Sequence, residues 1–99
     1  MIESRDWSAS ETVEPDGRRR LRVAGTCVVP TSGWGGALRR HHAQEAADEL
    51  LLDLVLDRPT GPVLQVISSV HVAYEETTDR GYARVSVLPD GPRGIPVAR

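Results

Sequence analysis

Apolar residues alternate with polar or small residues over several stretches of this 99-residue chain. The clearest stretch runs from Leu21 to Val29, where the odd-numbered positions are Leu, Val, Gly, Cys and Val, while Arg22 and Thr26 lie between them. A period of two is the spacing of a β-strand with one buried face. Similar alternation runs over residues 64–74 and 82–88, so we expect a protein built of β-strands.

Residues 43–56 fit two structures. The first part, residues 43–49, is rich in Ala, Glu and Gln, which favour a helix. From Leu50 to Leu56 every second residue is Leu, and Asp53 lies at an intervening position. We predict a short helical turn near residues 43–49 followed by a strand, with one helix over residues 43–56 as the alternative.

The predicted fold class is all-β, a small antiparallel β-sandwich or a partly open barrel. Five expected strands, over residues 21–29, 37–42, 50–56, 64–74 and 82–88, with short turns and no crossover helix favour this architecture over a parallel sheet. The length suits one domain, which we place at residues 18–90. Residues 1–17 are expected to form a mostly flexible tail closed by the turn Glu14-Pro15-Asp16-Gly17, and residues 91–99 a loose tail.

The charges are segregated along the chain. Residues 18–40 contain six arginines and no acid, whereas residues 45–79 contain eight acids and one arginine, so we expect the two stretches to attract each other. Every basic residue is Arg, which indicates a GC-rich genome of the kind found in many bacteria. The single cysteine, the absence of a signal-like segment and the absence of a long apolar run predict a cytoplasmic protein without membrane contact.

No combination of residues predicts catalysis or a cofactor. The candidate metal ligands are His41, His71 and Cys27, but their spacing matches neither a zinc finger nor a zinc ribbon. His41 and His42 would point to opposite faces of a strand, which argues against a shared site. Cys27 has the parity of a buried residue, and no serine lies in a Gly-x-Ser-x-Gly motif. We therefore predict a protein that is not an enzyme and holds no metal.

Nucleic acid is not an expected partner. The arginine stretch could contact phosphates, but the formal net charge is −2 and only four residues are aromatic. A protein partner is more consistent with the segment from Pro30 to Gly36, in which Trp34 lies among small residues. Either Trp34 is an exposed recognition residue on a rigid scaffold, or it fills an aromatic-poor core. The predicted contact residues are Thr31, Ser32, Gly33 and Trp34, with Arg39 and Arg40 as a polar rim.

At this segment the chain resembles two groups of β-sandwich proteins. They are the C-terminal domain of the protease-complex stabilising lipoproteins and, more distantly, the chagasin-type inhibitors of cysteine proteases. The shared turn reads Pro30-Thr31-Ser32-Gly33-Trp34, followed by Asp57-Arg58-Pro59 and Gln65-Val66-Ile67-Ser68. The resemblance implies an immunoglobulin-like sandwich that binds proteins, including proteases, through loops at one end. Val29 stands where the inhibitors carry Asn, so inhibition itself is not implied.

The function predicted from the sequence is a non-catalytic protein-interaction module that acts on or with a protease. Two alternatives stay open. One is a structural protein that self-associates through an edge strand such as Leu64–Tyr74. The other is a metal-binding protein or small enzyme that uses His41, His71 and Cys27.

Overall fold

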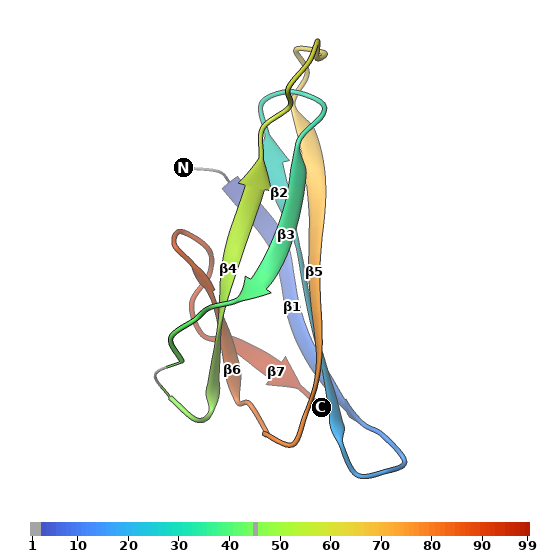
Figure 1. Cartoon of the computed structure of the whole chain (residues 1–99), viewed down its shortest axis with the longest axis vertical. Helices are drawn as coiled ribbons and strands as arrows, with labels where there is room; N and C mark the ends of the chain where they lie inside the picture. Colours follow the sequence, from blue (N-terminus) through green and yellow to red (C-terminus); the bar gives the residue numbers. More distant parts are fainter. Residues whose placement is uncertain (1–2, 45) are drawn as a thin grey trace.

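The computed structural model describes residues 3–44 and 46–99, and in these residues the chain forms seven β-strands and no helix (Figure 1). The all-β prediction is confirmed. The described residues accordingly contain no helix that is long and apolar enough to span a membrane. The strands are β1 (Glu3–Val13), β2 (Arg19–Val29), β3 (Gly35–Arg40), β4 (Glu49–Asp57), β5 (Ser68–Thr78), β6 (Arg84–Leu88) and β7 (Ile95–Ala98).

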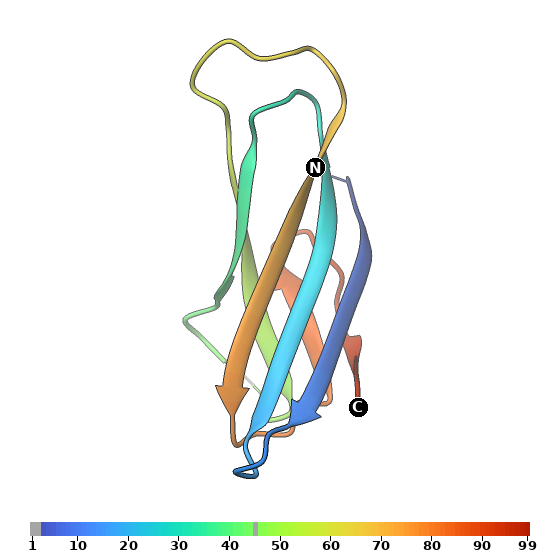
Figure 2. The same ribbon diagram turned by 90° about the vertical axis from the view of Figure 1, so that its right-hand side faces the viewer.

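The strands form one mixed sheet in the order β3-β4-β6-β7-β1-β2-β5, which curls until its two outer strands lie side by side. In Figure 2, β1, β2 and β5 form one layer in front of β3, β4 and β6. The β1–β7 and β4–β6 pairs are parallel and the other pairs are antiparallel. Alternation along a strand reports its buried face but not the direction of its neighbour. The two parallel pairs are therefore a feature that the sequence did not predict.

The longest ladder joins β2 to β5 over eleven residue pairs, from Arg19 with Thr78 to Val29 with Ser68. The apolar residues of β2 point inward as their parity predicts, and Leu21, Val23 and Cys27 are fully buried. On β5 the even-numbered apolar residues are the ones expected to point inward, and Val72 is buried as expected. The strand begins at Ser68 rather than at Leu64. Pro30 follows the last paired residue of β2 and has no N–H with which to extend the ladder.

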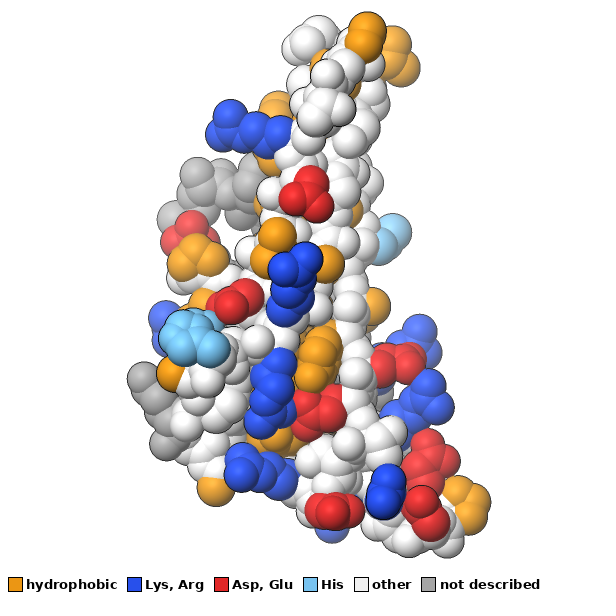
Figure 3. All heavy atoms as spheres, viewed as in Figure 1, with side chains coloured by type: hydrophobic (Ala, Val, Ile, Leu, Met, Phe, Trp, Pro, Cys, Tyr) orange, Lys and Arg blue, Asp and Glu red, His pale blue; other side chains and the backbone are white. Residues whose placement is uncertain are grey.

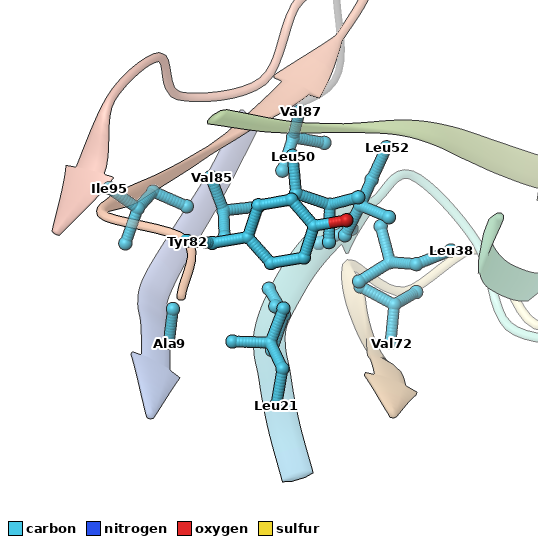
Figure 4. Packing of buried hydrophobic residues seen from close by; sticks show 12 residues of the cluster. Ala9, Leu21, Leu38, Leu50, Leu52, Val72, Tyr82, Val85, Val87 and Ile95 are labelled. Carbon is cyan, nitrogen blue, oxygen red and sulfur yellow. The ribbon is translucent and has the colours of Figure 1, made fainter. Parts of the chain in front are cut away.

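The core is aliphatic and has one aromatic residue at its centre. Tyr82 is 1 % exposed and is the largest fully buried side chain among the described residues. Figure 4 shows its ring among side chains from both layers of the sheet. These neighbours in the buried cluster include Ala9, Leu21, Leu38, Leu50, Leu52, Val72, Val85, Val87 and Ile95.

The predicted flexible tail at residues 1–17 is wrong for the part that the structure describes. Residues 3–13 form β1, which pairs with both β2 and β7. The predicted turn at residues 14–17 is present, with Gly17 at a φ of 88° and a hydrogen bond from its N–H to the Glu14 carbonyl at 2.9 Å. It connects β1 and β2 as a hairpin. The polar composition of β1 is explained by its mostly exposed residues.

The loose tail expected at residues 91–99 is also wrong. Residues 95–98 form β7, and Ile95 belongs to the buried cluster. The last residue is held as well, because Arg99 donates to the Tyr82 carbonyl at 3.0 Å and to the buried carboxylate of Glu11 at 3.4 Å. Arg19 donates to the same carboxylate at 2.7 Å. These bonds join the end of the chain to the β1–β2 hairpin.

The predicted helical turn near residues 43–49 is wrong for residues 43, 44 and 46–49, while Glu45 lies outside the described residues. Gln44 explains the difference. Its side chain donates to the carbonyls of His41 at 2.8 Å and Leu51 at 3.0 Å, and accepts from the Leu51 N–H at 3.0 Å. These bonds hold a loop between β3 and β4. The strand predicted after the turn is present as β4.

Candidate functional site

Two loops meet at one end of the molecule. One joins β2 to β3 at residues 30–34, and the other joins β4 to β5 at residues 58–67. Figures 1 and 2 show both loops at the top of the molecule. The Ser32 N–H donates to the Leu64 carbonyl at 3.1 Å, and the Leu64 N–H donates to Ser32 Oγ at 2.9 Å. This reciprocal pair holds the two loops together.

Trp34 lies on a groove between these loops. Its indole N–H donates to Thr31 Oγ1 at 3.0 Å, so the polar group of the ring is already satisfied within the loop. The Arg58 guanidinium carbon lies 6.0 Å from the ring centre, at the outer limit of a cation–π contact. The groove has a volume of about 530 Å³. Its lining residues are Pro30, Thr31, Trp34, Arg58, Pro59, Gly61 and Val63.

Gly33 allows the two loops to approach this closely. Its φ is 87°, in the region that favours glycine. A Cβ at this position would also lie 3.0 Å from Cβ of Pro59. The turn from Pro30 to Trp34 therefore depends on glycine both for its backbone angle and for the space between the loops.

Exposed apolar side chains continue from the groove along the second loop. Leu64 is 69 % exposed, Val66 52 % and Ile67 81 %. Apolar side chains are visible at this end of the molecule in Figure 3. We call Trp34, Leu64, Val66 and Ile67 the loop-end patch. Trp34 is half-buried. Its exposure therefore lies between those expected for an exposed recognition residue and for a residue that fills the core.

The predicted contact residues separate into two groups. Thr31, Ser32, Gly33 and Trp34 lie together at the loop end, and Thr31 and Trp34 line the groove. Arg39 and Arg40 lie at the far end of β3, about 15 Å along the strand at 3.3 Å per residue. They do not form a rim around Trp34. This position is taken by Arg58, which was not among the contact residues predicted from the sequence.

Arg40 takes part in a different cluster. Its Nη1 donates to Glu76 at 2.7 Å and to the Tyr82 hydroxyl at 3.2 Å, which connects β3 to β5. Arg39 is exposed and lies opposite Asp53 in the β3–β4 ladder. Arg20 and Arg22 contact Glu75 at 2.7 and 3.5 Å, whereas Arg19 pairs with Glu11 of β1 at 2.7 Å. The expected attraction between the two charged stretches is therefore present for Arg20, Arg22 and Arg40.

Tyr74 gives this cluster a measurable pH dependence. Its burial, together with its hydrogen bond to Glu76 at 2.7 Å, raises the pKa of the phenol to about 12. In the unfolded chain the same phenol ionises near pH 10. Stability is therefore fully present below about pH 10 and falls as the pH rises toward 12. Urea unfolding across this range should show the fall in wild type and a smaller one in Tyr74→Phe, and equal falls would contradict the assignment.

The structure does not bring the three candidate metal ligands together. Cys27 is fully buried on the inner face of β2, where burial raises the pKa of its thiol. His71 lies on the outer face, with Nδ1 3.0 Å from Thr26 Oγ1. His41 follows the end of β3, and its Nδ1 is 2.7 Å from Asp53. Among residues 3–44 and 46–99, no three side chains of metal-binding type form a cluster.

Comparison with known proteins adds no relative. No protein family, curated protein or solved structure matches this chain.

Proposed function

We propose that this chain is a protein-interaction module that binds its partner at the loop-end patch. The observation that carries the proposal is the exposure of Leu64, Val66 and Ile67 beside a groove that contains Trp34. Apolar side chains that gather on a surface commonly mark a binding site. Trp and Arg are also the residues most enriched among those that dominate binding energy.

The chemistry of the groove defines the kind of partner. The Trp34 N–H is already bonded to Thr31, so the ring offers an apolar face to a ligand. Arg58 adds a positive charge beside that face. A partner segment with an apolar side chain followed or preceded by a carboxylate would satisfy both. The hydrogen bonds between Ser32 and Leu64 order the loops before binding, which reduces the entropy cost of association.

A protease or a protease complex is the first partner class to test. This part of the proposal comes from the likeness of the turn from Pro30 to Trp34 to the protease-complex stabilising domains and the chagasin-type inhibitors. From the same likeness we propose that the partner is bound, as in immunoglobulin-like domains, by loops at one end of a β-domain. Fold and turn similarity alone do not determine function, so the partner must be identified by binding.

Capture experiments with matched variants test the proposal. Trp34→Ala and Ile67→Ser should each lower the amount of the captured partner at least about tenfold, as expected when about 1.4 kcal/mol or more of binding energy is lost. Val13→Ser is the matched control, because Val13 is 67 % exposed but lies at the end of β1, before the β1–β2 turn. The captured protein is then purified and titrated against each variant. Equal affinities for all variants would contradict the proposal.

Self-association is the alternative that this design must separate. Leu64–Tyr74 was the edge expected to pair between copies, but from Ser68 onward β5 is paired with β2 along one edge and lies against β3 along the other. Light scattering of the purified chain gives the oligomeric state before any capture. A dimer that Ile67→Ser converts to a monomer would assign the loop-end patch to self-association and overturn the proposal.

A further inference from the structure

Two adjacent histidines lie together beyond the end of β3. The ladder of β3 with β4 ends at Arg40, and although the His41 N–H still bonds to the Leu51 carbonyl, the chain bends at His42, so the two side chains are not directed to opposite faces. Their ring centres are 4.4 Å apart with a tilt of 46° between the planes. Figure 3 shows histidine side chains gathered on this surface beside acidic ones. The expectation that adjacency separates them is wrong for this reason.

His41 is held in one orientation. Its Nδ1 lies 2.7 Å from Asp53 Oδ1, and a carboxylate can only accept a hydrogen bond. Nδ1 is therefore the protonated nitrogen of the neutral ring, and Nε2 has a free lone pair. A carboxylate that fixes the second nitrogen of a histidine is the usual outer-shell partner of a metal ligand.

The backbone that carries the two rings is also fixed. Gln44 donates to the carbonyls of His41 and Leu51, and the His41 N–H donates to the Leu51 carbonyl at 2.9 Å. These bonds hold the start of the β3–β4 loop against β4. His42 is exposed and His41 is half-buried, so the site is open to a metal ion from solvent.

The separation of the rings indicates which metals they suit. A metal about 2.1 Å from one nitrogen of each ring lies about 3.2 Å from each ring centre. When one nitrogen of each ring faces a shared metal, two ring centres 4.4 Å apart subtend about 90° at that metal. This is the angle between neighbouring ligands in tetragonal Cu²⁺ and Ni²⁺ complexes, and imidazole suits both ions.

We propose that His41 and His42 form a chelating site for a divalent transition-metal ion, with Cu²⁺ or Ni²⁺ as its preferred occupants and Asp53 as the group that orients His41. The remaining coordination positions are open to water or to a donor from another molecule. The inference is independent of the loop-end patch, because the two histidines follow the opposite end of β3.

Calorimetric titration of the untagged protein with Cu²⁺ and with Ni²⁺ tests the site. We expect one saturable site per chain, lost in His41→Ala and in His42→Ala, and about tenfold weaker in Asp53→Asn. The matched control is His71→Ala, since His71 lies on the outer face of β5 against Thr26 and should not affect binding. Mg²⁺, which prefers oxygen ligands, should give no heat.

Electron paramagnetic resonance of the Cu²⁺ complex checks the ligand set. The proposal requires nitrogen splitting from two imidazoles, reduced to one in His42→Ala. All variants should keep the wild-type circular dichroism spectrum, which separates loss of the site from loss of the fold. Absence of saturable binding in wild type, or binding that His42→Ala leaves unchanged, would overturn the proposal.

Discussion

Tyr82→Ala is expected to lower the free energy of unfolding by about 3–5 kcal/mol, the usual cost of removing a fully buried aromatic ring. Tyr82 is 1 % exposed and lies at the centre of the aliphatic cluster (Figure 4). No other Tyr, Trp or Phe in the described residues is fully buried, so no other aromatic ring is in place to fill the cavity. The loss is a large fraction of the 5–15 kcal/mol by which domains are stable. Urea denaturation followed by tryptophan fluorescence measures it.

Tyr82→Phe separates the ring from its hydroxyl. The hydroxyl accepts one hydrogen bond from Arg40 at 3.2 Å. Arg40 also keeps its bond to Glu76, so Tyr82→Phe should cost only about 1 kcal/mol. If Tyr82→Ala were no more costly than Tyr82→Phe, the ring would not be the centre of the core.

Gly25→Ala should destabilise the fold by about 1–3 kcal/mol through overpacking. A Cβ at position 25 would lie 2.5 Å from Cδ2 and 2.7 Å from Cε2 of Trp7. Trp7 packs against the core beside a bulge in β1, where Asp6 has a φ of 58° and the register with β2 shifts. Gly61→Ala is the control, because a Cβ there meets nothing within 4 Å.

A double-mutant cycle identifies Trp7 as the cause. In a Trp7→Ala background the ring is gone, so Gly25→Ala should become neutral or stabilise by about 0.5–1 kcal/mol, as alanine does relative to glycine in a strand. Far-UV circular dichroism provides a signal that does not depend on Trp7. Equal costs of Gly25→Ala in both backgrounds would show that the strain lies elsewhere.

The strands with one apolar face could be predicted from the sequence. In β2, the alternation of Leu21, Val23 and Cys27 with arginine and threonine gives the correct buried face. β1 could not be found in this way, because Ala9 is the one buried apolar residue that it contributes and Glu11 is a charged residue that is buried as well. The signal for β1 was the turn at residues 14–17, since a tight turn before β2 implies a strand on its other side.

The pairing of distant strands had no local signal. β7 is four residues long and is stabilised by its neighbours β6 and β1, which lie far from each other in the sequence. The ladder of β5 with β2 starts at Ser68 because Pro30, which directly follows β2, has no N–H with which to extend it. As a result, Val66 and Ile67 continue the alternation of the strand but are exposed on a loop.

The candidate site was predicted in part. The composition of the segment from Pro30 to Trp34 indicated the first loop, and the glycine requirement at Gly33 follows from its φ of 87°. Arg58 and Leu64 were not predicted as site residues, because their positions depend on the contact between two loops about thirty residues apart. The rim role given to Arg39 and Arg40 was wrong, because a strand carries each residue about 3.3 Å further from the loop.

Site-specific photo-cross-linking tests the proposed binding site most directly. A benzophenone amino acid is placed at position 67 in the loop-end patch and, as the control, at position 13, which is also an exposed apolar position. Binding at the patch predicts one discrete cross-linked partner from position 67, strongly reduced by Trp34→Ala and absent from position 13. The same products from both positions, or a product from position 67 that Trp34→Ala leaves unchanged, would contradict it.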